Sequence, residues 1–235
     1  MDGVLLVNKP AGLTSHDVVQ LVRRKLRIRR IGHTGTLDPD AEGLLVLLIG
    51  GATKSQRECQ RRDKTYEGVV RLGRQTDTGD ASGAVVREAP VPSLDTAAIE
   101  RAFEPFRGRL MQTPPAYSAV KVRGRPAYWW ARQQRPVTLA ARAVEIRELA
   151  LLSFGPDTIR FRVRCSAGTY VRTLAESIAE RLGTAGHLGA LVRLTIGDWR
   201  LEEARTLEWI RGAEPDAVAG QVRPVEPAPH GGADA

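Results

Sequence analysis

Cysteine is nearly absent from this sequence of 235 residues, which contains only Cys59 and Cys165. Two cysteines this far apart provide neither a disulfide framework nor a metal-binding spacing. Both are expected to be ordinary core or edge thiols, and a reducing cytoplasm is the simplest setting for the chain. Histidine is also sparse, and none of the other three lies at metal-ligand spacing from His33. No metal site is therefore predicted.

Long hydrophobic runs are missing as well. No stretch approaches the roughly 18 consecutive apolar residues that a membrane-spanning helix requires, so no membrane association is expected. The amino terminus is short and acidic, which does not resemble a signal peptide. With 42% hydrophobic residues, the sequence has the composition of a globular protein with a substantial core.

Several familiar ligand-binding motifs fail when their spacing is checked. Residues 50–55 resemble a phosphate-binding loop, but Thr53 stands where that motif needs a glycine directly before the lysine. Asp77 and Asp80 fall at the wrong positions for a calcium-binding loop. The zinc-deaminase signature is absent. These motifs therefore predict no cofactor.

Positive charge is what the sequence has in excess. Its 35 lysines and arginines outnumber its 27 acids and give a formal charge of +8. Arginine dominates these cations, and guanidinium groups match phosphates in bidentate fashion. The excess therefore favours a polyanionic partner such as nucleic acid. Genomic base composition would also enrich arginine, so charge alone leaves the partner open.

The spacing of apolar residues predicts an α+β fold with a mixed, mainly antiparallel central sheet flanked by helices and loops. Strands are predicted at residues 4–7, 44–49, 64–72, 117–122, 144–154, 158–165 and 187–199. Helices are predicted at residues 14–26, 53–62, 95–106, 127–134, 169–182 and 206–210. Residues 212–235 are rich in alanine, proline, glycine and acids and are expected to form a disordered tail.

The loop over residues 29–43 is the most distinctive stretch, because it holds Asp38 between a leucine and a proline. The apolar run 44–49 follows, and a buried strand there would hold the loop rigidly. An aspartate before proline in a glycine-rich loop is more often a turn residue than a catalytic one. Asp40 and Glu42 lie nearby and leave a paired-carboxylate glycoside hydrolase open, although the arginine excess disfavours it.

Three further residues are ambiguous from their local pattern. Tyr66, at the start of a predicted strand, is either an ordinary half-buried aromatic residue or a stacking platform for an extruded base. Tyr170 and Arg172 open a predicted helix. Arg172 is either a solvated helix charge or the partner that keeps a carboxylate ionised.

Several segments, taken together, resemble the TruB family, the tRNA pseudouridine-55 synthases. They follow the family order along the chain: residues 8–15, 32–39, 64–66 with 76–80, 114–121 and 166–174. The resemblance extends from about Val4 to Trp199, and several long motifs in order are far more specific than any one of them. The chain departs from the family at residues 192–195, where the family often has a second arginine after the first, at Ala167 and at the Trp129-Trp130 pair. By comparison with the family, most or all of the usual C-terminal RNA-binding domain is expected to be missing.

The resemblance implies isomerisation of uridine 55 in the tRNA T-loop to pseudouridine, without a cofactor. It implies a cytoplasmic monomer that binds the T-arm and needs no obligate protein partner. Residues 1–211 would form the catalytic domain, with an RNA-gripping insertion near residues 113–136. The alternative from another class is a non-catalytic tRNA-binding or folding chaperone that uses the same cleft.

The resemblance also assigns roles to individual residues. Asp38 would be the nucleophile, Tyr66 would stack on the flipped base, and Tyr170 and Arg172 would flank the catalytic acid, with Arg172 keeping it ionised. The residues that the resemblance places in substrate binding are His33, Lys9, Gly35, Thr36, Tyr117, Lys121 and Arg132. His33 would take the vacated base position or support the loop, and Lys9 would support the first motif near the site.

Overall fold

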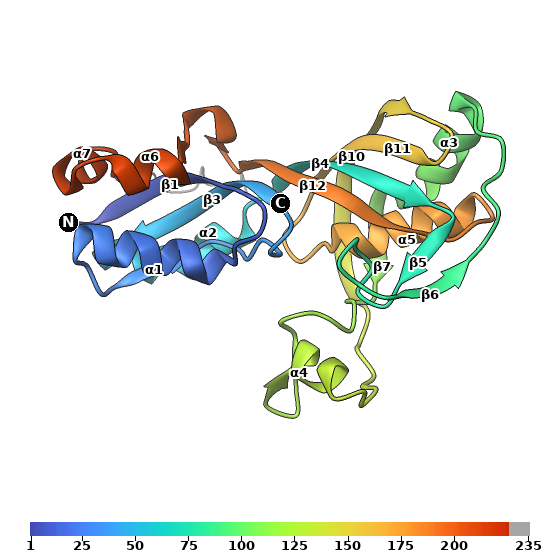
Figure 1. Cartoon of the computed structure of the whole chain (residues 1–235), viewed down its shortest axis with the longest axis horizontal. Helices are drawn as coiled ribbons and strands as arrows, with labels where there is room; N and C mark the ends of the chain where they lie inside the picture. The colour runs from blue at the N-terminus through green and yellow to red at the C-terminus, as the bar shows by residue number, and fades with distance from the viewer. Residues whose placement is uncertain (226–235) are drawn as a thin grey trace, which may run out of the picture. The chain divides into compact units, whose positions relative to one another are not determined.

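The computed structural model describes residues 1–225, and their contacts divide the chain into two compact units (Figure 1). Unit 1 consists of Met1–Lys64 and the chain from Val192 onward, and unit 2 consists of Thr65–Leu191. The α+β class with a mainly antiparallel sheet is confirmed. The catalytic domain expected over residues 1–211 includes residues of both units, and it stays a prediction.

Unit 1 is built around β1 and β3, which pair in antiparallel register from Gly3↔Ile49 to Lys9↔Gly43. The strand order here is β14-β1-β3-β12, with β2 also paired to β3, and β12 (Gly186–Ile196) enters unit 1 at Val192. Its elements are β1 (Gly3–Lys9), α1 (Ser15–Leu26), β2 (Ile31–His33), β3 (Glu42–Ile49), η1 (Gly50–Ser55), α2 (Gln56–Arg61), β13 (Trp199–Arg200), η3 (Leu201–Glu203), β14 (Arg205–Thr206), α6 (Leu207–Gly212) and α7 (Pro215–Ala219).

The β1–β3 pair is covered on both faces, because alternate residues of a strand point to opposite sides. One set of side chains, including Leu5 and Leu45, packs with α1, α6 and α7. The other set, including Leu6 and Leu44, packs with the α2 region and with Trp199. Burial on both faces explains why β3 reads as one continuous apolar run.

Helix α1 begins where the sequence predicts it. Thr14 is the N-cap, its hydroxyl accepts from the Asp17 N–H at 3.1 Å, and the Asp17 carboxylate accepts from the Thr14 N–H at 2.9 Å. This reciprocal capping box satisfies two of the free donors at the helix start. The helix is thereby fixed directly after the turn that follows β1.

Unit 2 carries the strand order β12-β4-β11-β10-β7. The strands predicted over residues 144–154 and 158–165 are confirmed, and they pair as an antiparallel hairpin with Leu149 opposite Val163. The elements of this part of the chain are β4 (Lys64–Leu72), β5 (Arg74–Thr76), β6 (Val85–Glu88), α3 (Thr96–Phe103), η2 (Glu104–Phe106), β7 (Gly108–Gln112), β8 (Lys121–Val122), β9 (Arg125–Pro126), α4 (Ala127–Arg132), β10 (Arg142–Phe154), β11 (Thr158–Cys165), α5 (Val171–Arg181) and β12 (Gly186–Ile196).

The core of unit 2 follows from the alternation in its strands. Along β11 the apolar residues are buried while the arginines at 160, 162 and 164 are exposed. Phe161 is fully buried, as are Ile178 on α5 and Phe103 on α3. Arg160 and Arg162 lie on the outer face and pair with Glu67 of β4, at 3.6 and 2.7 Å.

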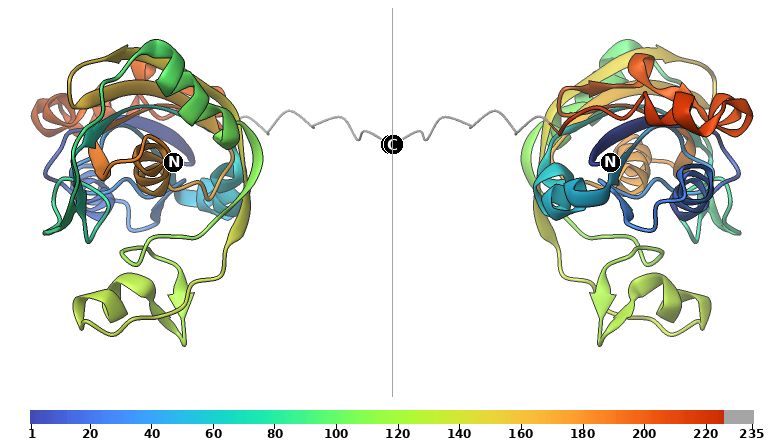
Figure 2. Two further views of the ribbon diagram at one scale, coloured as in Figure 1. Left: turned by 90° about the vertical axis from the view of Figure 1, so that its right-hand side faces the viewer. Right: turned by 90° about the vertical axis from the view of Figure 1, so that its left-hand side faces the viewer.

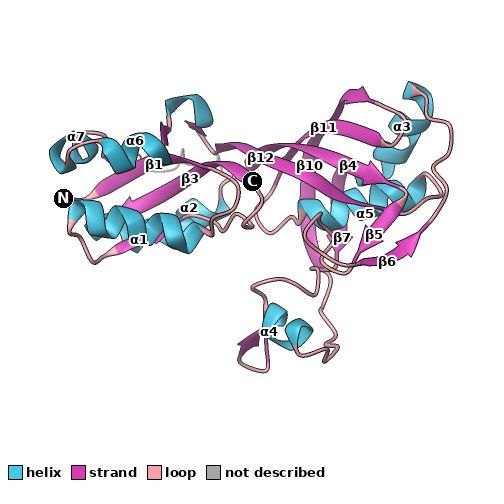
Figure 3. Cartoon of the chain, in the orientation of Figure 1, coloured by secondary structure: helices cyan, strands magenta, loops and turns pink. Residues whose placement is uncertain are grey.

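The segment around α4 stands away from the strands of its own unit, as both views in Figure 2 show. Loops connect it to β7 on one side and to β10 on the other (Figure 3). Within it, β8 and β9 form a two-residue ladder that precedes the helix. The strand expected over residues 117–122 is therefore wrong except for Lys121–Val122, because residues 116–119 form bends.

The carboxyl-terminal expectation needs a correction. Residues 215–219 form helix α7, and Val218 is fully buried against α1. Arg223 exchanges two main-chain hydrogen bonds with Val4, at 2.7 and 2.9 Å. Disorder from Gly212 onward is therefore wrong for residues 213–225, because an apolar side chain and a strand edge hold this stretch. The remainder of the expected tail lies outside the described residues.

Candidate active site

The loop that carries Asp38 connects β2 to β3 in unit 1. Leu37 is buried, and its N–H donates to Ser15 Oγ at 2.9 Å, while Ser15 Oγ–H donates to the Leu37 carbonyl at 3.1 Å. The Asp38 carbonyl accepts from the Ala41 N–H at 3.1 Å, which closes a turn. Asp38 itself is half-buried. The acid is thus presented by a loop whose backbone is fixed by helix α1 and by its own turn.

Lys9 is a fully buried cation beneath this loop. Its ammonium group donates to the carbonyl oxygens of Pro10, Leu13 and Pro39, at 2.9, 2.7 and 2.9 Å. An ammonium has three hydrogens, so none remains for a substrate. This corrects the expected place of Lys9 among the substrate-binding residues. It instead ties the end of β1 to the residue after Asp38.

Arg193, on β12, is a second buried cation that contacts both ends of the loop. It is 1% exposed, its Nε donates to the Leu44 carbonyl at 2.7 Å, and its Nη2 donates to the Gly35 carbonyl at 3.1 Å. Sequence reasoning treated this stretch only as a departure from the family. Arg193 could have been noticed from the sequence because it is a charged residue within a predicted strand, where burial would force its guanidinium group to find carbonyl acceptors.

Gly43 is required by the close approach of β12. Its φ is +99°, and a β-carbon would lie 2.4 Å from the Arg193 carbonyl oxygen and 2.8 Å from the Arg193 nitrogen. The two residues are paired in the parallel β3–β12 ladder. A glycine at this position therefore lets β12 bring Arg193 against the loop.

His33 lies half-buried at the start of the loop, and its Nδ1 accepts from the Gly35 N–H at 3.3 Å. Burial, together with the nearby Arg193 charge, lowers the pKa of His33 from its ordinary value of 6.5. The ring is therefore neutral at pH 7, with Nδ1 as the acceptor. Gly35 takes part in this anchoring, and Thr36 is exposed next to it.

In unit 2, Arg172 is held at three points. It is 6% exposed, its Nη1 donates to the Thr78 carbonyl at 2.7 Å, and its Nη2 donates to the Tyr117 carbonyl at 2.9 Å. Its Nε lies 3.7 Å from the Asp80 carboxylate. The solvated helix charge is therefore excluded for Arg172. Its pairing with Asp38 joins residues of different units and stays a prediction.

The polar motif around Asp80 supports this arginine. Asp80 Oδ1 accepts from the Thr78 hydroxyl at 2.7 Å and from the Ser82 hydroxyl at 2.6 Å, which makes a tight turn. Gly79, with φ of +75°, lies against the carboxylate of Glu176, one helical turn beyond Arg172 on α5. Burial raises the pKa of the Glu176 carboxyl. The side-chain oxygens of this motif bind its own hydroxyl groups and face Arg172, so the motif supports that arginine and does not form a cation-binding loop.

The two candidate tyrosines lie on different elements of unit 2. Tyr66 is 9% exposed on β4 and shares the buried face of that strand. Tyr170 is half-buried at the N-cap of α5, where its N–H donates to Gln112 Oε1 at 2.7 Å. Gln112 Nε2 donates back to the Tyr170 carbonyl at 3.1 Å. These two bonds fix the start of α5 to β7, directly before Arg172.

The remaining predicted residues belong to the α4 segment. Lys121 on β8 and Arg132 on α4 are both exposed, and Tyr117 is half-buried. Tyr117 reaches Arg172 through its backbone carbonyl. Arg172 therefore ties the beginning of this segment to α5, within the same unit. The charged side chains of the segment remain in solvent.

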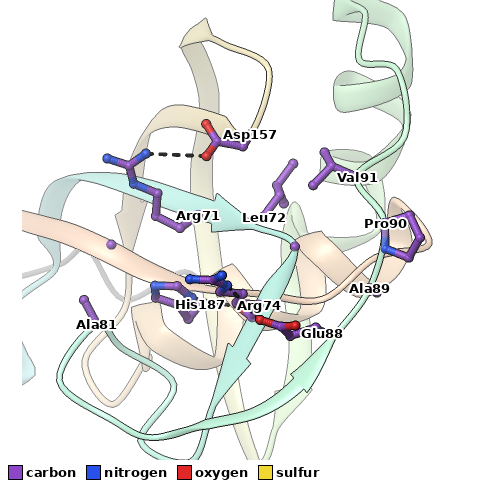
Figure 4. A pocket seen from close by; sticks show the side chains of 12 residues that line it. Arg71, Leu72, Arg74, Ala81, Glu88, Ala89, Pro90, Val91, Asp157 and His187 are labelled. Atoms are coloured by element: carbon purple, nitrogen blue, oxygen red, sulfur yellow. Dashed lines mark hydrogen bonds and ion pairs between the residues drawn. The ribbon is translucent and has the colours of Figure 1, made fainter.

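A groove of about 1020 Å³ lies on unit 2, next to the end of β4 (Figure 4). Arg71 lies 3.7 Å from Asp157, and Arg74 lies 2.9 Å from Glu88, so each arginine is matched by an acid. His187 Nδ1 is 2.8 Å from the Arg74 carbonyl. None of the predicted site residues is among those that line the groove. Its balanced charge makes it unlike a phosphate-binding site.

Metal ligands, apolar helices and cysteines are described here for residues 1–225. No three or more His, Cys, Asp or Glu side chains of this range gather closely enough to hold a metal ion. Across the same residues, no helix is long and apolar enough to cross a membrane. Cys59 and Cys165 are buried free thiols in different units. No disulfide joins the two units through these cysteines.

Comparison with protein families gives a match over residues 23–171 to the TruB family pseudouridylate synthase N-terminal domain. A protein of Burkholderia pseudomallei named tRNA pseudouridine synthase B is 46% identical over 226 residues, which is 96% of this chain and 74% of that protein. The protein of the same name from Opitutus terrae is 45% identical over 225 residues, which is 96% of this chain and 93% of that protein.

Solved structures with the same fold come from larger assemblies. A chain of a Cbf5-Nop10-Gar1 complex matches with a TM-score of 0.70 and 26% identity, over 94% of this chain and 60% of that one. A chain of an H/ACA RNP bound to a substrate RNA containing 2'-deoxyuridine matches with a TM-score of 0.65 and 25% identity, over 88% of this chain and 51% of that one. The present chain thus spans about half to three fifths of those solved chains.

Proposed function

Because this chain belongs to the TruB family of pseudouridylate synthases, we propose that it converts the uridine at position 55 of the tRNA T-loop to pseudouridine. The reaction is an isomerisation: the bond between uracil nitrogen and ribose breaks, the uracil turns, and a bond forms between ribose and a uracil carbon. Atoms and electrons balance without an oxidant, a reductant or a second substrate. The proposal includes no cofactor.

The observation that carries the proposal is the way in which the Asp38 loop is held. Lys9 and Arg193 are buried cations whose hydrogen bonds go to the backbone of the loop and its flanks. Burying a cation costs free energy unless its hydrogen-bond donors are satisfied. Two such cations bound to one loop therefore point to a loop whose exact position matters. Asp38 is the acid so positioned, and we assign it the role of nucleophile.

Two groups of unit 2 act with that acid in the proposed reaction. Arg172 keeps Asp38 ionised, and the fixed guanidinium supports this role because it loses little freedom when it pairs. Tyr66 stacks on the flipped uracil. His33 is neutral, so it can replace the extruded base next to the loop without bringing an uncompensated charge into the site.

The test is tritium release from tRNA transcript labelled at carbon 5 of uracil, since that hydrogen leaves when the new carbon bond forms. Wild type should release tritium, and Asp38→Asn should release it at least about 10³-fold more slowly while it binds tRNA normally. Asp40→Asn is the matched control, because Asp40 is an exposed acid of the same loop and should keep its activity.

Two outcomes would contradict the proposal. Tight tRNA binding without any release by wild type would favour the chaperone reading, in which the same surface folds tRNA and performs no chemistry. Equal release by wild type and Asp38→Asn would remove Asp38 from its role while leaving the activity in place.

A further inference from the structure

The α4 segment carries a face made of two arginines and two aromatic side chains. Arg132 lies four residues after Tyr128 and three after Trp129 in α4, so these three side chains share one side of the helix. Arg125 lies on β9, just before the helix. The Arg125 guanidinium lies 5.4 Å from the centre of the Trp129 ring, and the Arg132 guanidinium lies 5.6 Å from the centre of the Tyr128 ring. These four residues are called the aromatic stripe below.

The opposite side of α4 is the one that packs. Ala127 is fully buried and its N–H donates to the Val120 carbonyl at 2.7 Å. The Trp130 indole N–H donates to the Val122 carbonyl at 3.1 Å. These bonds hold the helix on residues 118–122. The aromatic stripe is consequently turned outward.

Exposure agrees with this orientation for Arg125, Tyr128 and Arg132, which are exposed, with Tyr128 at 41%. Trp129 and Trp130 are both half-buried, and their ring centres lie 4.8 Å apart in an edge-to-face contact. The indole of Trp130 is held by its hydrogen bond to Val122, so Trp130 is the anchor, and the part of Trp129 that reaches solvent is available to a ligand. The exposed Tyr128 ring and the half-buried Trp129 ring lie beside two exposed guanidinium groups, and this combination is what a ligand could use.

The charge around the stripe identifies the kind of ligand. No acid occurs between Glu104 and Glu145, and residues 113–136 contain five cations: Lys121, Arg123, Arg125, Arg132 and Arg135. A surface with aromatic faces and uniformly positive charge complements a ligand with planar apolar faces and repeated negative charge. An unpaired nucleotide in RNA has both, because its base has two π-faces and its phosphates are anionic.

We infer that the aromatic stripe stacks an unpaired base of the RNA substrate on Trp129, while Arg125 and Arg132 hold the phosphates on either side of that base. The identity of the RNA as tRNA rests on the proposed function. The base held here is distinct from the uridine that is isomerised, because Tyr66 serves that one.

The first experiment measures binding of a T-arm stem-loop RNA by Trp129→Ala and Trp129→Phe. The alanine variant should bind about tenfold to a hundredfold more weakly, the usual range for loss of one base–aromatic stack, and the phenylalanine variant should keep most of the affinity. The dependence of affinity on salt should be the same in all three proteins, because no charge is removed.

Trp209 provides a matched control. It is half-buried in unit 1, and the Arg205 guanidinium lies 5.2 Å from its ring centre, so it forms the same kind of pair outside the α4 segment. Trp209→Ala should leave RNA affinity within about twofold of wild type at temperatures where the variant is folded. An equal loss for both alanine variants would mean that the effect of Trp129 is structural and would overturn the inference.

A second experiment identifies the base. Single abasic nucleotides are placed in turn at the unpaired positions of the stem-loop, and each RNA is bound to wild type and to Trp129→Ala. One abasic position should make the two proteins equal in affinity, as in a double-mutant cycle for two groups in contact. If the ratio of affinities is constant over all positions, no base stacks on Trp129.

The inference and the proposed function fail in different ways. Normal tritium release by wild type, with RNA affinity unchanged in Trp129→Ala, would overturn the inference and leave the function standing. Absence of tritium release by wild type, with RNA affinity reduced in Trp129→Ala and retained in Trp129→Phe, would overturn the proposed function and leave the inference about the stripe standing.

Discussion

Cations serve different ends in the Asp38 loop and in the α4 segment. Beneath the loop, Lys9 and Arg193 are 0% and 1% exposed, and their donors are bound to carbonyl oxygens of unit 1. In the α4 segment, Lys121, Arg125 and Arg132 are exposed in a stretch without acids. The first arrangement fixes a backbone, and the second leaves charge available to a partner.

The physical reason for the difference is the environment of the charge. A cation taken out of water loses its hydration, so each of its hydrogens must find an acceptor, and the acceptors are then held in place. An exposed cation keeps its hydration and attracts phosphates over a distance that salt shortens. Substitutions should therefore act on stability and chemistry in the loop, but on salt-dependent binding in the α4 segment.

The largest effect should come from Lys9→Met, which keeps the shape of the side chain and leaves three buried carbonyls without their donor. The free energy of unfolding should fall by about 2–4 kcal/mol, measured by urea denaturation followed by circular dichroism. Lys25→Met is the control, because the Lys25 ammonium also donates to two carbonyls, of Arg211 and Ala213, but lies nearer to solvent. Losses of the same size in both variants would show that burial is not what matters.

Arg193→Lys should have the next largest effect. Lysine keeps the charge but lacks the planar fork that reaches the Gly35 and Leu44 carbonyls together, so Asp38 should be less well positioned. We expect kcat to fall about 10- to 100-fold with little change in tRNA affinity. Arg62→Lys is the comparison, because Arg62 is buried over Trp199 in the same unit at 4.2 Å. It should lower stability alone, and a drop of kcat in both variants would contradict a specific role for Arg193.

Arg132→Gln should produce a smaller effect of a different kind. Affinity for tRNA should fall a few-fold, and the slope of log affinity against log salt should decrease by about 1, because one phosphate contact is lost. The free energy of unfolding should not change. Arg101→Gln, at an exposed arginine on α3, should leave the slope as it is. An unchanged slope in Arg132→Gln would place Arg132 outside the RNA path.

The smallest effect should come from His33→Asn and concerns pH. The pKa of His33 is lowered in the folded protein, so below the ordinary value of 6.5 the unfolded chain binds more protons and stability falls as pH falls. Removing the imidazole should therefore flatten the decline in unfolding free energy between about pH 7 and pH 5. His16→Asn, at an exposed histidine, is the control. An equally steep decline in wild type and His33→Asn would contradict the assignment.

Much of the fold could be predicted from local sequence patterns. The helix predicted from residue 14 and the strands predicted over residues 64–72, 144–154 and 158–165 rest on local signals, and α1, β4, β10 and β11 appear close to these positions. The helix α7 was not predicted, because its composition matches a flexible tail. Its one buried residue, Val218, packs with residues of α1, which lie about 200 positions earlier in the chain.

The sequence by itself determined the family, the loop with its one acid between leucine and proline, and the positive charge of residues 113–136, because motif order and residue type are properties of the chain. Only the tertiary structure decided that Lys9 has no hydrogen left for a substrate and that Arg193, far away in sequence, joins Gly35 to Leu44. It likewise decided which side of α4 faces outward. Burial sets these outcomes, and burial depends on segments that the sequence does not place next to one another.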